Sequence, residues 1–266
     1  MPDILTIATY NANSIRVRLE QVLAWLERVR PDVLAIQETK CADESFPADA
    51  VRAAGYHVAY RGKGGHGGVA LLSRDEPQDV AYGLDDDEEP DEHRLVRAKV
   101  RGVAVVNTYV PQGREVASEI FAYKLRWFER LRCLFERHYY PTQPLVWLGD
   151  LNVAPEPIDV HDPKRHANHV DYHPEARAAL ERTMAWGFVD VFRRLHPDEP
   201  EQYTYWDYRA RNPVANKVGW RIDHIMATPP LAATATEAWI DVDERLAVRP
   251  SDHTFLVTRF DLSQLL

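Results

Sequence analysis

The chain has 266 residues, of which 45% are hydrophobic and 10% aromatic, enough to fill the core of one large domain or two small ones. No apolar stretch approaches the roughly 20 residues of a membrane-spanning helix, and the N-terminal segment MPDILTIATY lacks the basic start and cleavage site of a signal peptide. We therefore expect a cytoplasmic protein. The formal charge of −9 at first disfavours a nucleic-acid partner, because nucleic acids are themselves negatively charged.

The acidic residues are unevenly distributed. Residues 85–93, DDDEEPDEH, hold seven of the 41, so the rest of the chain is close to neutral, and such a run is typical of a solvated loop. Carboxylates that bind a metal ion would not repel a phosphate. The two cysteines, Cys41 and Cys133, lie far apart and are predicted to be reduced thiols. The overall charge therefore leaves a phosphate-containing partner open.

The N-terminal elements predict an α/β protein. Residues 4–10, ILTIATY, read as a buried strand. Asn13 or Ser14 can cap a helix with apolar residues at helical spacing, which Pro31 ends. Residues 33–38, VLAIQE, read as the next strand. A strand, a helix and another strand in succession indicate layers of sheet and helix.

The rest of the chain continues this alternation without an internal repeat or a linker, so we expect a single domain over residues 1–266. Aromatic residues at helical spacing on the long helix indicate core packing. The later predicted elements are, in chain order, a hairpin around 62–68, strands at 95–100 and 103–110, a helix at about 116–139, the strand 145–152, a helix near 174–186, an aromatic run at 203–208, and strands at 220–228 and 255–260.

Several apolar runs stop at a polar residue. Ligands collect at strand ends in α/β sheets, so these residues are predicted to converge on one rim. Asp150 and Asn152, two positions apart, would point to the same side of an extended segment and grip one water or phosphate oxygen. The polar residues at these strand ends are Asn11, Glu38, Tyr109, Asp150 and Asn152.

The strand at 220–228 places Asp223 among apolar residues, where an unpaired carboxylate would be costly, so we expect His253 as its partner. A carboxylate bonded to an imidazole raises the imidazole pKa and leaves a cationic donor for a phosphate oxygen. Glu38 and Asp252 remain as hard oxygen ligands suited to Mg²⁺. Together the residues predict a metal-assisted hydrolase of phosphate esters.

Six ordered motifs carry a family resemblance. They are ATYNANSIR, LAIQETK, NTYVPQG, WLGDLNVAP, WRIDHI and PSDHTF. They resemble the exonuclease III and abasic-site (AP) endonuclease family of DNA repair enzymes, within the endonuclease/exonuclease/phosphatase superfamily. The resemblance implies a four-layer α/β sandwich, with two mixed β-sheets packed face to face and helices outside. It also implies a monomeric, Mg²⁺-dependent phosphodiesterase, with Mn²⁺ a possible substitute, that cuts double-stranded DNA 5′ to an abasic site and processes damaged 3′ ends.

The resemblance also implies a role for each matched residue. Glu38 would ligate the metal with support from Asn11. Asp150 would orient or deprotonate the attacking water, and Asn152 would hold that water or the phosphate. Tyr109 would contribute its phenol to the phosphate or leaving group. Asp223 would orient His253 towards phosphate, and Asp252 would serve the metal region.

The segments YTYWDYR and VGWRI resemble the family's abasic pocket, whose apolar walls admit a baseless sugar and exclude an intact nucleotide. Tyr205, Trp220 and Ile222 match the lining positions, with Trp206 beside them, although core packing is an alternative for Trp206. Basic residues in the motif loops are candidates for the DNA backbone, among them Arg114 and Lys217.

The His-rich segment at 161–173 has irregular spacing and no cysteine, which disfavours zinc. We hypothesise instead that it borders the DNA and sets the balance between internal cleavage and 3′-end trimming.

Two alternative readings stay open. Sphingomyelinases and inositol polyphosphate phosphatases share the GDxN and SDH motifs, but TYVPQG, WDYR and VGWRI favour DNA repair, and no membrane-binding face is apparent. A catalytically silent DNA-binding relative would have lost a metal or water residue. All such residues are present, so catalysis is favoured.

Overall fold

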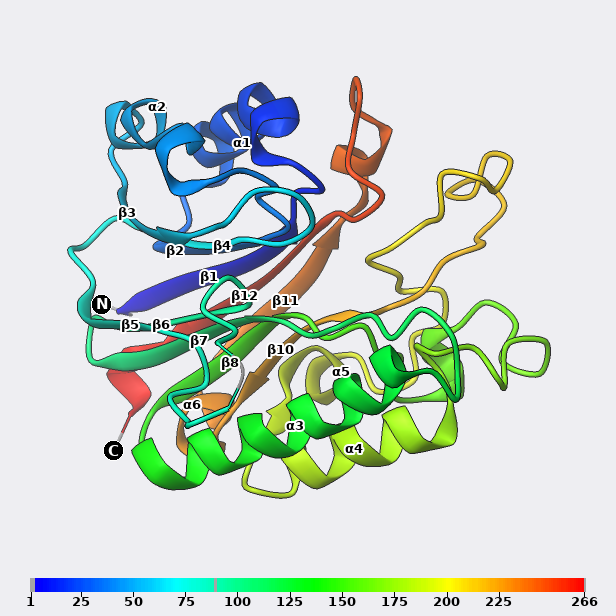
Figure 1. Ribbon diagram of the computed structural model, residues 1–266. Coiled ribbons are helices and arrows are strands. Elements are labelled where there is room, and N and C mark those ends of the chain that lie inside the picture. Colours follow the sequence, from blue (N-terminus) through cyan, green and yellow to red (C-terminus); the bar gives the residue numbers. More distant parts are fainter. Residues whose placement is uncertain (1–2, 89, 266) are drawn as a thin grey trace.

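The computed structural model describes residues 3–88 and 90–265 and arranges them in two six-stranded sheets that lie face to face (Figure 1). Both sheets are mixed, because β1–β2 and β7–β8 pair in parallel and the other pairs are antiparallel. The first sheet has the order β11 (Ala235–Asp241), β12 (Phe255–Asp261), β1 (Ile4–Asn11), β2 (Val33–Gln37), β4 (Val69–Ser73), β3 (His57–Arg61). The second has the order β5 (Gln78–Tyr82), β6 (Leu95–Val100), β7 (Val103–Tyr109), β8 (Leu145–Asp150), β10 (Asp223–Ala227), β9 (Val189–Asp190).

Helices cover the outer faces of both sheets (Figure 1). α1 (Ile15–Val29) and α2 (Ala48–Ala53) pack on the first sheet, and α3 (Glu119–His138) and α4 (Pro174–Met184) pack on the second. The short helices α5 (Val191–Leu195) and α6 (Pro229–Ala233) contribute to the core between the sheets. The predicted four-layer sandwich is confirmed.

The apolar runs of the central strands follow from burial on both faces. On β1, Leu5 and Ile7 point into the core between the sheets, whereas Ala8 and Tyr10 pack under the helices. β8 alternates in the same way between its two covered faces. A strand covered on both sides cannot alternate between apolar and polar residues, which is why these segments read as continuous apolar runs.

The helix boundaries differ slightly from the predicted ones. α3 begins at Glu119 rather than 116, because the Ser118 hydroxyl caps it by accepting a hydrogen bond from the Phe121 amide at 3.1 Å. Phe121, Phe128 and Phe135 of the predicted aromatic stripe are buried. Ser14 holds the N-cap position of α1 with a φ of 96°, but its side chain makes no capping hydrogen bond, so that part of the prediction is wrong.

Other differences lie at the margins of the sheets. The strand predicted from residue 220 begins only at Asp223, and the aromatic run makes isolated bridges instead of a strand. The sequence did not predict β5, β9, β11, α2, α5 or α6. These elements are short or lie at sheet edges, where one exposed face weakens the apolar pattern.

The acidic stretch is not wholly solvated, contrary to expectation. Asp86 and Asp91 accept hydrogen bonds from the Arg130 guanidinium on α3 at 2.7 and 3.0 Å, and Asp91 is buried. Tyr123 also bonds to Asp91. These contacts tie the loop to the helix layer of the second sheet. Glu89 lies outside the described residues.

Within residues 3–88 and 90–265, no helix has both the length and the apolar character required to span a membrane.

Candidate active site

The strand ends predicted to carry polar residues meet at one rim of the two sheets. Asn11 at the end of β1 bonds across the sandwich to Asp150 at the end of β8, and antiparallel β10 begins there with Asp223 opposite Asp150. The rim contains a pocket of about 610 Å³. The predicted site residues in its walls are Glu38, Tyr109, Asp150, Asn152, Tyr205, Trp220, Ile222, Asp252 and His253.

The Asn11 amide lies between two carboxylates. Its Nδ2 donates to Glu38 Oε1 at 2.9 Å and to Asp150 Oδ2 at 2.8 Å. Glu38 follows β2 with a φ of 50°, which turns its side chain into the rim. Lys40 Nζ lies 2.7 Å from Glu38 Oε2. Burial opposes the charge of Glu38, but Lys40 and the Asn11 amide outweigh it and lower its pKa. Glu38 is therefore an ionised oxygen donor.

Asp150 is the last residue of β8 and is almost completely buried. Gly149 before it has a φ of 137°, and a Cβ there would lie 1.9 Å from the Thr108 carbonyl oxygen, so this close approach of β7 and β8 requires glycine. Burial raises the pKa of Asp150 well above its ordinary value; Asp223 and Glu38 act in the same direction, and His253 opposes them. A carboxylate with a raised pKa is suited to accept a proton.

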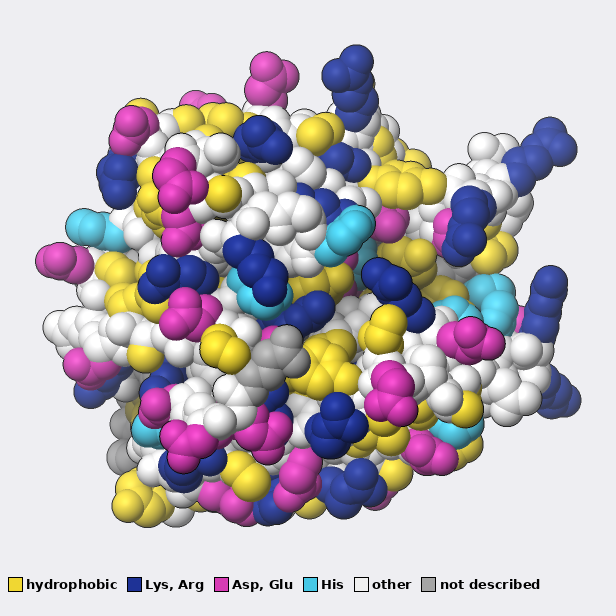
Figure 2. All heavy atoms as spheres, viewed as in Figure 1, with side chains coloured by type: hydrophobic (Ala, Val, Ile, Leu, Met, Phe, Trp, Pro, Cys, Tyr) yellow, Lys and Arg dark blue, Asp and Glu magenta, His cyan; other side chains and the backbone are white. Residues whose placement is uncertain are grey.

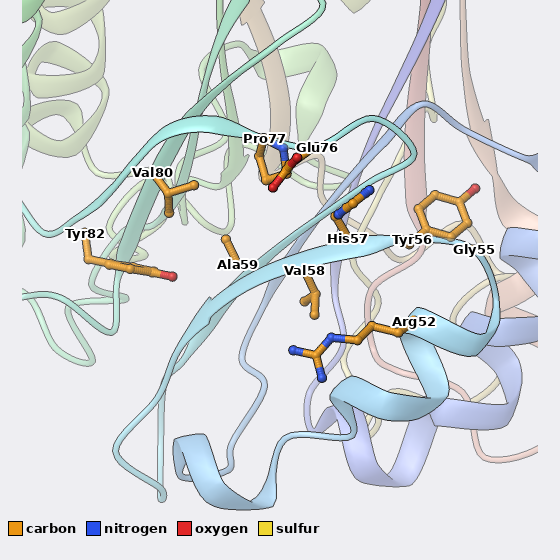
Figure 3. Close-up of a pocket in the computed structure, with 10 residues that line it drawn as sticks. All are labelled: Arg52, Gly55, Tyr56, His57, Val58, Ala59, Glu76, Pro77, Val80 and Tyr82. Atoms are coloured by element: carbon orange, nitrogen blue, oxygen red, sulfur yellow. The ribbon is translucent and has the colours of Figure 1, made fainter.

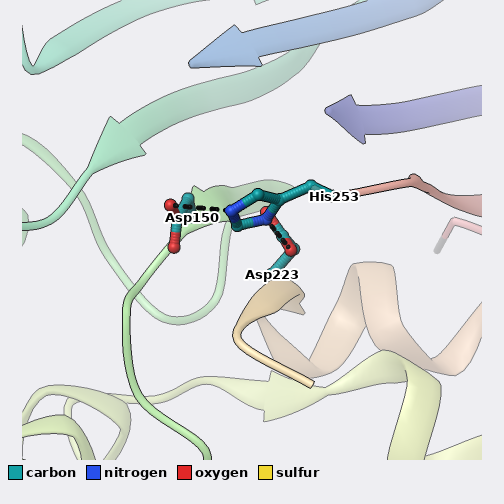
Figure 4. Close-up of side chains that lie close together, drawn as sticks. All are labelled: Asp150, Asp223 and His253. Carbon is teal, nitrogen blue, oxygen red and sulfur yellow. Dashed lines mark hydrogen bonds and ion pairs between the residues drawn. The ribbon is translucent and has the colours of Figure 1, made fainter. Parts of the chain in front are cut away.

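His253 is held between two carboxylates (Figure 4). Its Nδ1 lies 2.7 Å from Asp223 Oδ2, and its Nε2 lies 3.8 Å from Asp150 Oδ2. The predicted Asp223–His253 pair is thus present. Burial favours the neutral ring, but the charges of Asp223 and Asp150 outweigh it and raise the pKa of His253 to about 10. At neutral pH the ring is a cation that can donate a hydrogen bond.

Asn152 follows a tight turn rather than an extended segment. β8 ends at Asp150, the φ of Asn152 is 49°, and its amide donates to Asp150 Oδ1 at 2.9 Å. The side-chain Nδ2 donates to the Val110 carbonyl oxygen at 2.9 Å. The prediction that both side chains share one side of an extended strand is wrong, but the turn brings both into the same pocket.

Tyr109 ends β7 beside these carboxylates. Burial raises the pKa of its phenol well above the ordinary value, and the charges of Glu38 and Asp150 act in the same direction. The Arg94 guanidinium stacks over the ring at 4.8 Å from its centroid and donates to the Tyr109 carbonyl oxygen at 3.2 Å. Tyr109 is therefore a fixed, protonated hydrogen-bond donor.

Asp252 lies in the pocket wall next to His253. Its Oδ1 accepts hydrogen bonds from Asn13 Nδ2 at 2.8 Å and from the Ser251 hydroxyl at 3.3 Å. Ser251 also donates to the Asn11 carbonyl oxygen at 2.8 Å. These bonds connect the loop before β12 to the end of β1.

The other wall of the pocket is aromatic and apolar. Tyr205 and Trp220 exchange two backbone hydrogen bonds of 2.9 Å, and the Tyr205 ring lies 4.9 Å from the His253 ring. Trp220 and Ile222 are buried against Val160. Histidine and hydrophobic side chains gather in the hollow at the right of the molecule, between loops with Lys and Arg at their tips (Figure 2).

The sequence profile of the endonuclease/exonuclease/phosphatase family matches residues 8–253. The chain belongs to this family. Exodeoxyribonuclease III of Haemophilus influenzae is 34% identical over 263 residues, which cover 95% of this chain and 98% of that protein. The structure of an AP endonuclease from Archaeoglobus fulgidus is 48% identical with a TM-score of 0.95, over 97% of this chain and 99% of that one.

The 3′-5′ exonuclease NExo from Neisseria meningitidis is 35% identical with a TM-score of 0.92, over 97% of this chain and 100% of that one. A second structure of the Neisseria enzyme, described as a 3′ phosphatase, is bound to a product DNA hairpin. As a member of the family with these relatives, the chain is a phosphodiester hydrolase of the DNA-repair nuclease type.

Three residues named as candidates for substrate contact, Trp206, Arg114 and Lys217, do not line the pocket. Trp206 is buried behind it, and a Cβ on Gly219 would lie 2.7 Å from its Nε1. Arg114 is exposed on the loop after β7. Lys217 is exposed and pairs with Glu201. Asn11 also lies behind the wall and reaches the pocket only through the carboxylates that it holds.

The sequence reasoning missed three polar residues beside the site. Gln112 and Asp171 line the pocket and bond to each other at 3.2 Å. Lys124 of α3 has no exposed side-chain surface, and its Nζ donates to the Asn152 carbonyl oxygen at 2.6 Å and to Asp171 Oδ1 at 3.1 Å. A lysine on the apolar face of a predicted helix was the available signal for Lys124.

The oxygen donors fit a hard divalent cation. Asp150, Asp223 and His253 present ligand atoms within 4.8 Å of one another. Because His253 bonds to Asp223 and has a raised pKa, it offers no lone pair, and the Glu38 carboxylate, held by Asn11 and Lys40, is the better donor.

A hollow of about 670 Å³ lies away from this rim, between the edge strands β3 and β5 (Figure 3). Val58 and Ala59 of β3 line it from one sheet, Val80 and Tyr82 of β5 line it from the other, and Arg52 of α2 completes the lining. It contains no predicted site residue. The rim pocket is smaller than this hollow, but it contains the carboxylates and the imidazole whose pKa values are shifted. The rim pocket is therefore the candidate active site.

Proposed function

We propose that this nuclease is a Mg²⁺-dependent abasic-site endonuclease that cuts the phosphodiester 5′ to a baseless sugar and also processes damaged 3′ ends. The observation that carries the proposal is the position of the apolar wall of Tyr205, Trp220 and Ile222 directly beside the cluster of Asp150 and His253. A pocket for a sugar without a base therefore adjoins groups suited to hydrolysing a phosphodiester.

Glu38 would hold the metal ion, with the Asn11 amide fixing its carboxylate and Asp252 serving the outer part of the metal region. All these donors are oxygens, which favours Mg²⁺, with Mn²⁺ as a substitute. When bound, the ion supplies positive charge to the phosphate oxygens.

Asp150 would orient the attacking water and accept its proton, because its carboxylate lies in the pocket and the Asn11 amide fixes its Oδ2. Asn152 would orient that water or the phosphate, since the turn at residues 150–152 fixes its side chain in the pocket. His253 would donate from Nε2 to a phosphate oxygen while Asp223 holds Nδ1. Tyr109 would donate its phenolic proton to the phosphate or the leaving oxygen.

Selectivity would follow from the cost of extrusion. A nucleotide that has lost its base has neither pairing nor stacking to break, so moving its sugar out of the duplex is cheap. Trp206, buried behind the lining residues, would support the wall rather than contact the sugar. Arg114 and Lys217, which are both exposed, would contact the backbone of the flanking DNA. We also propose that the chain acts as a single-domain monomer.

The decisive experiment measures Mg²⁺-dependent cleavage of two labelled duplexes, one with an internal abasic analogue and one undamaged with a recessed 3′ end. Wild type and Asp150→Asn are compared on both. We expect incision beside the lesion together with slower trimming of the recessed end, and loss of both in the variant. Trimming without any incision would replace the proposal with 3′-end processing, and EDTA-resistant or absent cleavage would refute the metal-dependent mechanism.

A further inference from the structure

Two imidazoles in the wall of the pocket face each other. His161 follows the bridge between Val160 and Trp220, and the chain turns back so that His166 Nε2 lies 3.3 Å from His161 Nε2. Both side chains are partly exposed and both line the pocket. Their irregular sequence spacing disfavoured a metal site, but hydrogen-bonded turns, the first from Asp162 to His166, bring them together.

Hydrogen bonding fixes the tautomer of one ring. His161 Nδ1 lies 3.2 Å from the Gly219 carbonyl oxygen, which only accepts, so in the neutral ring Nδ1 carries the proton and Nε2, which faces His166, has the lone pair. A backbone carbonyl that holds the far nitrogen of a histidine is the usual outer support of a metal-binding imidazole.

The spacing of the two nitrogens suits a metal ion. Two nitrogens at about 2.0–2.1 Å from one tetrahedral zinc ion lie about 3.3 Å apart. Among the residues that the structure describes, no third His, Cys, Asp or Glu atom joins this pair to make a compact three-ligand group. His169 packs against Trp220 at 4.8 Å, and its Nδ1 accepts a hydrogen bond from the Asp171 amide at 3.3 Å.

We propose that His161 and His166 bind one first-row transition-metal ion such as Zn²⁺ at the wall of the pocket, separate from the carboxylate site. Imidazole nitrogen favours zinc, nickel and copper over Mg²⁺, whereas the carboxylate site favours Mg²⁺. With two protein ligands, the remaining positions of the ion are open to water or to a substrate phosphate. Both imidazoles pack against Trp220, with ring centroids at 6.0 and 4.9 Å, so an ion bound between them would narrow the entrance to the apolar wall.

Metal binding itself is tested by calorimetric titration of Zn²⁺ in the presence of millimolar Mg²⁺, which occupies the carboxylate site. Wild type is compared with His161→Ala, His166→Ala and the matched control His57→Ala, whose histidine is exposed on β3 at the edge of the sandwich. We expect one ion in wild type and in the control, and affinity at least about tenfold weaker in the two site variants.

A spectroscopic measurement identifies the ligands. Cu²⁺ added in place of Zn²⁺ should give an electron paramagnetic resonance spectrum with nitrogen splittings from two imidazoles in wild type, and from one or none in either site variant. Circular dichroism confirms folding, and His161→Gln provides a second variant that preserves more side-chain volume. Equal affinity in all proteins, the absence of binding in wild type, or an unchanged nitrogen pattern in the variants would overturn the proposal.

A second experiment tests whether the bound ion changes the rate of DNA cleavage. It rests on the proposed abasic-site function and is measured independently of metal binding. We expect stoichiometric Zn²⁺ to slow incision of the abasic duplex in wild type more than in His166→Ala. If wild type does not cut abasic DNA in Mg²⁺ alone, the proposed function fails while the binding data still decide the metal site. Inhibition that is equal in both proteins would overturn the assignment of the ion to the pocket wall.

Discussion

Replacement of Lys124 by methionine should destabilise the protein and disturb the active site together. The ammonium group is completely buried and donates to the carbonyl oxygens of Gln112, Asn152 and Val170 and to the Asp171 carboxylate, at 2.6–3.1 Å. Burial lowers the pKa of Lys124, and the charge of Asp171 opposes that shift. Methionine preserves the packing volume but leaves a buried carboxylate without its cation.

Removing one partner of a buried ion pair costs about 3–5 kcal/mol. That is a large part of the total stability of about 5–15 kcal/mol that is typical of a folded protein. We therefore expect the free energy of unfolding of Lys124→Met, from urea titrations followed by circular dichroism, to fall by about 3–5 kcal/mol. Because Lys124 holds the Asn152 carbonyl, kcat should fall more than KM rises.

Two comparisons separate this network from a general effect on the helix. Arg132, on the same helix, pairs with Glu129 and Glu136 at the surface, so Arg132→Met should cost less than about 1 kcal/mol. Adding Asp171→Asn to Lys124→Met should recover part of the lost stability, because it removes the unpaired charge. A loss below about 1 kcal/mol in Lys124→Met, or no coupling in the double variant, would refute the reasoning.

Asp223→Asn should move the alkaline limit of kcat/KM down by about one pH unit or more, because His253, whose pKa is raised to about 10, loses a charge that keeps it cationic. The stability that the Asp223–His253 pair contributes is complete below the pKa of an unfolded histidine and is lost as pH rises through about 10. The free energy of unfolding, measured from neutral to alkaline pH, should therefore fall in wild type and change little in the variant. Glu38→Gln should raise the Mg²⁺ concentration for half-maximal cleavage at least about tenfold, and an unchanged Mg²⁺ titration would exclude Glu38 as a ligand. Trp220→Ala should reduce the preference for abasic over intact duplex about 10- to 100-fold, measured as a ratio of kcat/KM values, and a retained ratio would remove Trp220 from the selective wall.

Most of the architecture could be predicted from local pattern. The apolar runs at 4–10, 33–38, 103–110 and 145–152 form strands because both of their faces are covered, and the polar residues that end them meet at one rim. The Asp223–His253 pair was predictable because a carboxylate inside an apolar strand needs a partner. Edge strands and short helices were missed because each exposes one face and so carries a weaker periodic signal.

What the sequence pattern determined by itself is the layering of sheet and helix and the chemical types available at the strand ends, because strand periodicity and the desolvation cost of buried charge act locally along the chain. The number of layers came from the family resemblance. Only the tertiary structure decided which polar groups meet. It placed the Lys124 ammonium behind Asn152, buried Trp206 behind the pocket, and brought His161 and His166 to 3.3 Å. These outcomes depend on how segments far apart in sequence pack, and hydrophobic periodicity within one segment contains no information about the partner segment.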